Sequence, residues 1–152
     1  IASCLVGSEM CIRDSCCTPI SNRLPEEEKG VSLDELNHLK YRSIVGSLLY
    51  ISNFTRPDIS YSGLRCSEKN NCPTQEDMVQ VKRIMRYLQG TKSKNLSISK
   101  GKDKIYGYCD ASWGDRSGSK STTGYVIYYG NMPIIWNSHK QSIVAHSTQK
   151  AN

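Results

Sequence analysis

The chain has 152 residues, the usual length of one domain, although length alone allows it to be a piece of something longer. Hydrophobic residues make up 38% of it, and no apolar run approaches the roughly 18 residues that a membrane-spanning helix needs, which excludes a membrane protein. Twenty Lys and Arg against fourteen Asp and Glu give a net charge of +6, so a polyanion such as nucleic acid is a plausible partner.

The first fifteen residues have neither a helical nor a strand period and no charged start of a signal peptide. Their run CLVGSEMCIRDS resembles a translated library adaptor, so residues 1–15 are predicted to be an adaptor-like or disordered leader. The seven cysteines and three histidines lack the spacing of a disulfide framework or a structural metal site. Free thiols point to a reducing compartment, which predicts an intracellular, cytoplasmic protein.

Two helices are predicted after the polar stretch that ends at residue 30. Ser32 and Glu35 predict a capping box, and the helix that follows ends a few residues before Pro57. Its predicted apolar stripe comprises Leu36, Leu39, Ile44, Val45, Leu48 and Leu49. Thr55 and Asp58 predict a second capping box, with Pro57 tolerated in the first turn of the second helix.

The clearest predicted helix is the third. Thr74 and Asp77 have the spacing of a capping box, and Gly90 stands where a glycine often ends a helix. The expected buried residues are Met78, Val81, Met85 and Leu88. The opposite face carries Lys82, Arg83 and Arg86, which are either a solvated helix face or contacts to nucleic-acid phosphates.

From Asn95 the apolar period changes to two, which predicts strands. The expected strands contain Leu96 and Ile98, then residues 105–108, 125–129, 134–136 and 142–145. Gly130 and Asn131 form a hairpin turn signal between two of them. Three helices followed by antiparallel strands make the predicted fold class α+β.

One strand leads into Asp110, which a glycine-containing turn follows. A carboxylate at the end of a strand is a common ligand for a divalent metal ion. The simpler alternative is a turn aspartate that binds its own backbone.

Several separated motifs resemble the Pol polyprotein of copia-type LTR retrotransposons, and they occur in the same order from about Thr18 to the end of the chain. These motifs are YRSIVGSLLY (41–50), TRPDISY (55–61), CPT (72–74), VKRIMRYLQGT (81–91), GYCDASW (107–113), KSTTGYV (120–126) and WNSHKQSIVA (136–145). The resemblance implies that residues 16–100 are the mainly helical end of the reverse transcriptase and its connection region. It implies that residues 104–152 are the N-terminal antiparallel strands of an incomplete RNase H-like fold.

The family makes DNA from RNA and cleaves the RNA strand of RNA–DNA hybrids by two-metal hydrolysis. The resemblance therefore implies Mg²⁺ as cofactor, an RNA–DNA hybrid and the rest of the Pol polyprotein as partners, and a virus-like particle as location. Asp110 matches the first catalytic, metal-binding aspartate. The next acidic ligands fall in the run 147–152, where Lys150 and Asn152 stand in place of glutamates.

The remaining acids of the family site would lie beyond residue 152, and the paired aspartates of the polymerase would lie upstream. Because one carboxylate cannot hold two metal ions, the chain is predicted to be catalytically inactive. Two hypotheses stay open: a fragment of a degraded or mis-predicted polyprotein, and a host-retained nucleic-acid-binding module that has lost catalysis. An active nuclease would need acids from another chain. The candidate phosphate contacts are Lys82, Arg83, Arg86, Lys120 and Lys140.

Overall fold

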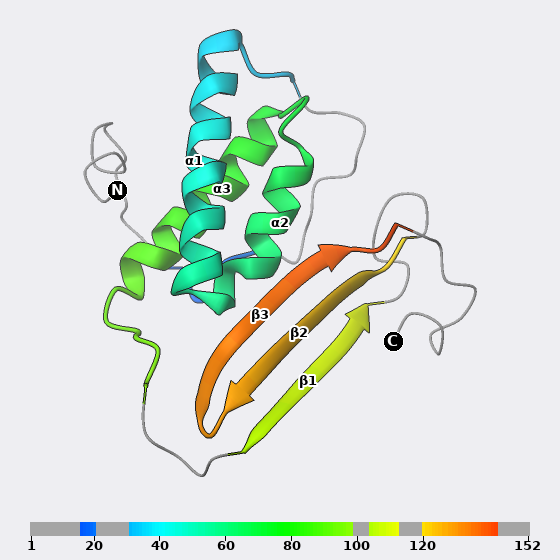
Figure 1. Ribbon diagram of the computed structural model, residues 1–152. Coiled ribbons are helices and arrows are strands. Elements are labelled where there is room, and N and C mark those ends of the chain that lie inside the picture. Colours follow the sequence, from blue (N-terminus) through cyan, green and yellow to red (C-terminus); the bar gives the residue numbers. More distant parts are fainter. Residues whose placement is uncertain (1–15, 21–30, 99–103, 113–119, 143–152) are drawn as a thin grey trace.

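The computed structural model describes residues 16–20, 31–98, 104–112 and 120–142 (Figure 1). Three α-helices precede a three-stranded antiparallel sheet, so the predicted α+β class is confirmed. In chain order the elements are α1 (Glu35–Phe54), the short 3-10 helix η2 (Pro57–Ile59), α2 (Ser60–Glu68), α3 (Gln75–Gly90), β1 (Ile105–Ser112), β2 (Thr122–Tyr129) and β3 (Met132–Lys140). The predicted leader and the run 147–152 lie outside the described residues.

Helix α1 does not begin with the predicted capping box. Its N-cap residue is Asp34, and Ser32 instead forms an isolated antiparallel bridge with Thr74. This bridge holds Ser32 in an extended conformation before the helix, so the capping role assigned to Ser32 and Glu35 is wrong. The end of α1 at Phe54 agrees with the prediction.

The buried face of α1 agrees with the predicted stripe only in part. Val45 and Leu48 are fully buried as expected, and Tyr41 joins them. Leu36 and Leu39, by contrast, are 61% and 60% exposed, so their predicted burial is wrong. A helix turns by about 100° per residue, which places these two leucines on the side opposite the buried row.

The connection from α1 to α2 also differs from the prediction. Pro57 does stand in the first turn of a helix, the 3-10 helix η2, but no side chain caps that helix. Thr55 Oγ1 donates to the carbonyl of Ile51 at 3.2 Å, and the carboxylate of Asp58 binds Arg56 instead. The capping box predicted for Thr55 and Asp58 is therefore wrong, because both side chains have other partners.

Helix α3 begins as predicted. Thr74 Oγ1 accepts the backbone N–H of Asp77 at 3.3 Å, and the Asp77 carboxylate accepts the N–H of Thr74 at 2.8 Å, which completes the capping box. The end differs, since Gly90 is the last helical residue and Thr91 is the C-cap. The most deeply buried residues of α3 are Met78, Val81, Ile84 and Tyr87, whereas the predicted Met85 and Leu88 are only partly buried.

The three helices enclose the hydrophobic core. Its buried members are Leu33, Tyr41, Val45, Leu48, Ile59, Cys66, Met78, Val81, Ile84 and Tyr87. The Tyr41 hydroxyl donates to the Cys66 carbonyl at 2.7 Å, which joins α1 to α2. Burial raises the pKa of the Cys66 thiol to about 12, so this cysteine is an unreactive core residue.

The sheet has the strand order β1-β2-β3. The predicted hairpin between β2 and β3 is confirmed, with Gly130 at a positive φ of 60° that favours glycine. The strand predicted at Leu96 and Ile98 is wrong: this segment is irregular, and Ile98 is 80% exposed because no neighbouring strand pairs with it. Ser142 lies outside any strand, and residues 143–145 are not described.

The helices lie on the β3 side of the sheet, and β1 is the strand farthest from them (Figure 1). The indole N–H of Trp136 in β3 donates to the carbonyl of Ser52 in α1 at 2.6 Å. Along the part of the chain described here, no helix is long and apolar enough to cross a bilayer.

Candidate functional site

A groove of about 470 Å³ lies between the sheet and the start of α2. The helical side contributes Pro57, Asp58 and Ser60. The sheet contributes residues of all three strands, among them Tyr108, Asp110, Gly124, Val126, Tyr128, Pro133, Trp136 and Ser138. This space is called the sheet groove below.

The floor of the sheet groove is one face of the sheet, because alternate residues of a strand point to the same side. The antiparallel register places Tyr108, Val126 and Trp136 in one row across the three strands. The next row contains Asp110, Gly124 and Ser138. Aromatic rings and a carboxylate are therefore neighbours on one surface.

Asp110 is exposed within β1 rather than at its end, since β1 continues to Ser112. Its Oδ1 accepts the backbone N–H of Ala111 at 2.8 Å. This contact matches the simpler of the two predictions, an aspartate that binds its own backbone.

The second carboxylate of the groove, Asp58, is already engaged. Arg56 donates to its two oxygens at 2.9 and 2.7 Å, and the hydroxyl of Tyr87 donates to Oδ2 at 2.7 Å. Partial burial alone would raise the pKa of Asp58, but the hydrogen bonds from Arg56 and Tyr87 outweigh it and hold the pKa below its ordinary value. Asp58 is therefore a charged structural residue.

The resemblance implies a site for two Mg²⁺ ions, which needs several converging acids. Among the residues described, no group of three or more His, Cys, Asp or Glu side chains could hold a metal ion. With Asp58 bound to Arg56, Asp110 is the one carboxylate of the sheet groove without a cationic partner among these residues. The described side chains do not fit a two-metal centre.

Three tyrosines on the groove face form a cluster that was not predicted from the sequence. The rings of Tyr106 and Tyr128 stack at 5.2 Å with an angle of 7°. Tyr108 meets both rings edge-on, at 5.9 and 6.2 Å, and is itself 66% exposed. The signal was present as aromatic residues at alternate positions of β1, opposite an aromatic residue of β2.

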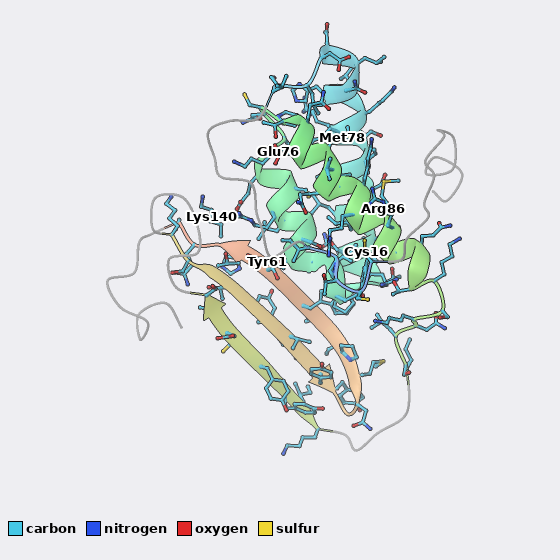
Figure 2. All side chains as sticks on the ribbon, turned by 180° about the vertical axis from the view of Figure 1, so that it is seen from behind. Cys16, Tyr61, Glu76, Met78, Arg86 and Lys140 are labelled. Atoms are coloured by element: carbon cyan, nitrogen blue, oxygen red, sulfur yellow. The ribbon has the colours of Figure 1, made fainter. Side chains whose placement is uncertain are left out.

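The five predicted phosphate contacts lie in two places. Lys82, Arg83 and Arg86 are on α3, where Arg83 donates to the carbonyl and hydroxyl of Thr18 at 3.2 and 3.0 Å. Lys120 precedes β2 and Lys140 ends β3. Arg86 and Lys140 lie on opposite sides of the molecule (Figure 2), so the five residues do not form one continuous patch.

A further basic and aromatic surface was not predicted. Arg42, Gly46, Tyr50 and Phe54 lie four residues apart along the exposed side of α1, and we call them the α1 outer face. A Cβ atom at Gly46 would meet nothing within 4 Å, so this position is open to close approach. The Tyr50 and Phe54 rings are 4.7 Å apart and exposed. The single apolar stripe predicted for this helix left its other side unassigned, so this surface was not predicted.

Comparison with known proteins gives the chain its family. It is 46% identical over 114 residues to the retrovirus-related Pol polyprotein from transposon RE1 of Arabidopsis thaliana, and 43% identical over 114 residues to that from transposon RE2 of the same plant. The chain belongs to the retrovirus-related Pol polyproteins of transposons. The resemblance found in its motifs is thereby confirmed.

Each of these two matches covers 74% of the chain and 8% of the relative, so the chain spans only a small part of their length. A shorter relative is secreted RxLR effector protein 161 of Plasmopara viticola, which is 34% identical over 115 residues that cover 74% of this chain and 81% of that protein. No family model and no solved structure matches the chain.

Proposed function

We propose that this chain is a nucleic-acid-contacting segment of a copia-type Pol polyprotein that covers the end of the reverse transcriptase, its connection region and the start of the RNase H domain. The parent protein would make DNA from RNA and cut the RNA strand of RNA–DNA hybrids. The observation that carries the nucleic-acid contact is the α1 outer face, with its exposed basic and aromatic residues and its open glycine.

The chemistry of α1 suits a polyanion. No acidic residue occurs from Leu36 to Phe54, whereas Lys40 and Arg42 are exposed there. An arginine at one end of the outer face can bind a phosphate, and the bare backbone at Gly46 lets a sugar–phosphate strand approach the helix closely. Tyr50 offers a flat apolar surface to sugars or bases. Contacts of this kind depend on backbone shape more than on base sequence.

The basic residues of α3 supply a second contact region. Lys82 and Arg86 are partly exposed, and Arg83 supports the segment around Thr18 instead. The charge they carry adds to the attraction for nucleic acid without specifying its sequence. Lys120 and Lys140 remain candidate contacts beside the sheet.

We propose further that the chain by itself does not cleave nucleic acid. In the parent site, Mg²⁺ held by Asp110 and further acids would activate water and stabilise the leaving oxygen. In the sheet groove the described residues offer Asp58 and Asp110, and Asp58 is paired with Arg56. Binding without cleavage is the activity that these side chains support.

The alternative is a nucleic-acid-binding module that acts outside a polyprotein. It is favoured by one observation, the short relative of Plasmopara viticola in which the matching region makes up 81% of the protein. Its name describes a secreted effector. Both alternatives use the same α1 outer face, so they differ in the length of the natural protein and not in this contact.

Anisotropy of a fluorescent RNA–DNA hybrid over a series of salt concentrations tests the proposal. We expect affinity to fall steeply with salt, because bound phosphates release counterions. Arg42→Ala should weaken binding and reduce the log–log salt slope by about one. Arg65→Ala on α2 is the matched control, since it removes the same charge at a different site, where Arg65 forms a 3.6 Å ion pair with Glu68. Salt-insensitive binding, or equal losses in both variants, would overturn the role of the α1 outer face.

A further inference from the structure

We propose that the sheet groove binds a single unpaired nucleobase that carries an amino group, such as adenine. This site goes beyond the hybrid contact proposed for α1 and lies on different elements. The residues that support it are the aromatic cluster and the row of Asp110, Gly124 and Ser138 beside it.

The aromatic part of the groove is fixed in place. Trp136 is held by its 2.6 Å hydrogen bond to the Ser52 carbonyl. Tyr108 is supported edge-on by the stacked rings of Tyr106 and Tyr128. Rings that are already held by neighbours lose little freedom when a ligand stacks on them, which favours binding.

The spacing of the strands suits a flat ligand. Tyr108 and Trp136 stand on either side of Val126 in one cross-strand row. Neighbouring strands are about 4.8 Å apart, so the two aromatic residues are separated by roughly 10 Å at the backbone. A planar ring fits over Val126 between them. The groove volume of about 470 Å³ lies in the range of small-molecule sites and accommodates a nucleotide.

The polar part of the groove selects a base with donors. Asp110 lies on the same face of β1 as Tyr108, about 7 Å further along the strand. Its Oδ1 binds the N–H of Ala111, while Oδ2 has no partner among the residues that the structure describes. The exocyclic amine of adenine can donate to this oxygen, whereas uracil offers a carbonyl at the equivalent edge. Gly124 beside Asp110 has no side chain to obstruct the approach.

Equilibrium dialysis of the purified chain with labelled AMP, UMP and inorganic phosphate tests the site. We expect saturable binding of AMP, at least several-fold weaker binding of UMP and none of phosphate alone. Tyr108→Ala should weaken AMP binding roughly tenfold or more, since stacking of one base contributes about that factor. Asp110→Ala should remove the preference for AMP over UMP. Tyr129→Ala is the matched control, because Tyr129 lies on the other face of β2.

Three results would overturn the proposal: no saturable AMP binding, equal binding of AMP by wild type and Tyr108→Ala, or tighter binding of arginine amide than of AMP. The last would mean that the aromatic rings and Asp110 form a site for a cationic side chain. Tyr108 is mostly exposed, so its variant should fold normally, which circular dichroism would check. If the wild-type chain bound an RNA–DNA hybrid but not AMP, the nucleobase site in the sheet groove would be refuted, whereas the contact proposed for the α1 outer face would not.

Discussion

The hydroxyl of Tyr87 in α3 donates a 2.7 Å hydrogen bond to Oδ2 of Asp58. Asp58 lies in η2, 29 positions earlier in the chain. Arg56 binds the same carboxylate and also donates to the carbonyl and hydroxyl of Thr91 at 3.2 and 2.7 Å. Its guanidinium lies 5.5 Å from the centre of the Tyr87 ring. The motifs TRPD and YLQGT are therefore in contact in the folded chain. Hydrogen bonds between their polar residues connect the end of α3 to the turn that follows α1.

Tyr87→Phe should lower the free energy of unfolding by about 1.5–3 kcal/mol, because it removes one hydrogen bond to a charged acceptor and keeps the buried ring. Urea denaturation followed by circular dichroism measures this change. Tyr50→Phe is a matched control, since Tyr50 is exposed on α1. A loss of equal size in both variants would show that the contact with Asp58 contributes nothing specific.

The stability of the chain should decrease on acidification, in part through Asp58. Arg56 and Tyr87 hold the pKa of Asp58 below its ordinary value, so the stabilisation is complete above about pH 4, the unfolded pKa, and is lost as the pH falls through the lower folded value. Asp58→Asn should be less stable at neutral pH and show a flatter dependence between about pH 4 and pH 2. Urea midpoints across this range provide the test, and parallel curves for the two proteins would contradict it.

Trp136→Phe should destabilise the attachment of the sheet to the helices. The Ser52 carbonyl lies in the last turn of α1, and the N–H of Arg56, four residues on, binds Ile51 instead. The indole of Trp136 therefore satisfies a helix-end carbonyl. Its loss should cost about 1–2 kcal/mol and increase amide exchange in β3. Ile135→Val, on the opposite face of the same strand, should leave β3 exchange near that of the wild type.

Gly46→Ala should separate stability from binding. The new methyl group meets no atom within 4 Å, so the gain in helix propensity should raise the free energy of unfolding by about 1 kcal/mol. Affinity for an RNA–DNA hybrid should nevertheless fall, because the methyl group occupies the point of closest approach on the α1 outer face. A stabilised variant with undiminished affinity would show that Gly46 is not at the contact.

The sequence was informative where the signal was local. The Thr74 capping box, the hairpin at Gly130 and the existence of the three long strands depend on neighbouring residues, and all three features were predicted. The strands are longer than predicted, since β1 continues past Asp110 to Ser112. Ser32 and Thr55 have the right local spacing for capping but are bound elsewhere, Ser32 by a bridge to Thr74. Such competition between partners depends on tertiary structure and cannot be detected from spacing.

The candidate sites were also predictable from the sequence only where the signal was local. The position of Asp110 was predicted from its motif. Asp110 is the one carboxylate of the sheet groove without a cationic partner among the described residues, because Arg56 and Tyr87 bind Asp58, and the sequence does not reveal that contact. The α1 outer face was hidden because the helix carries apolar residues on two sides, and periodicity alone assigned Leu36 and Leu39 to the core.

The central proposal for this chain is that it binds an RNA–DNA hybrid without cleaving it. A hybrid whose RNA strand carries a fluorescent label can be mixed with the chain and Mg²⁺ at low salt, followed by anisotropy and then examined on a denaturing gel. We predict that the hybrid is bound and that its RNA strand stays intact. Cleavage that depends on Mg²⁺ and disappears in Asp110→Asn would contradict this proposal, and so would an intact hybrid that the chain does not bind.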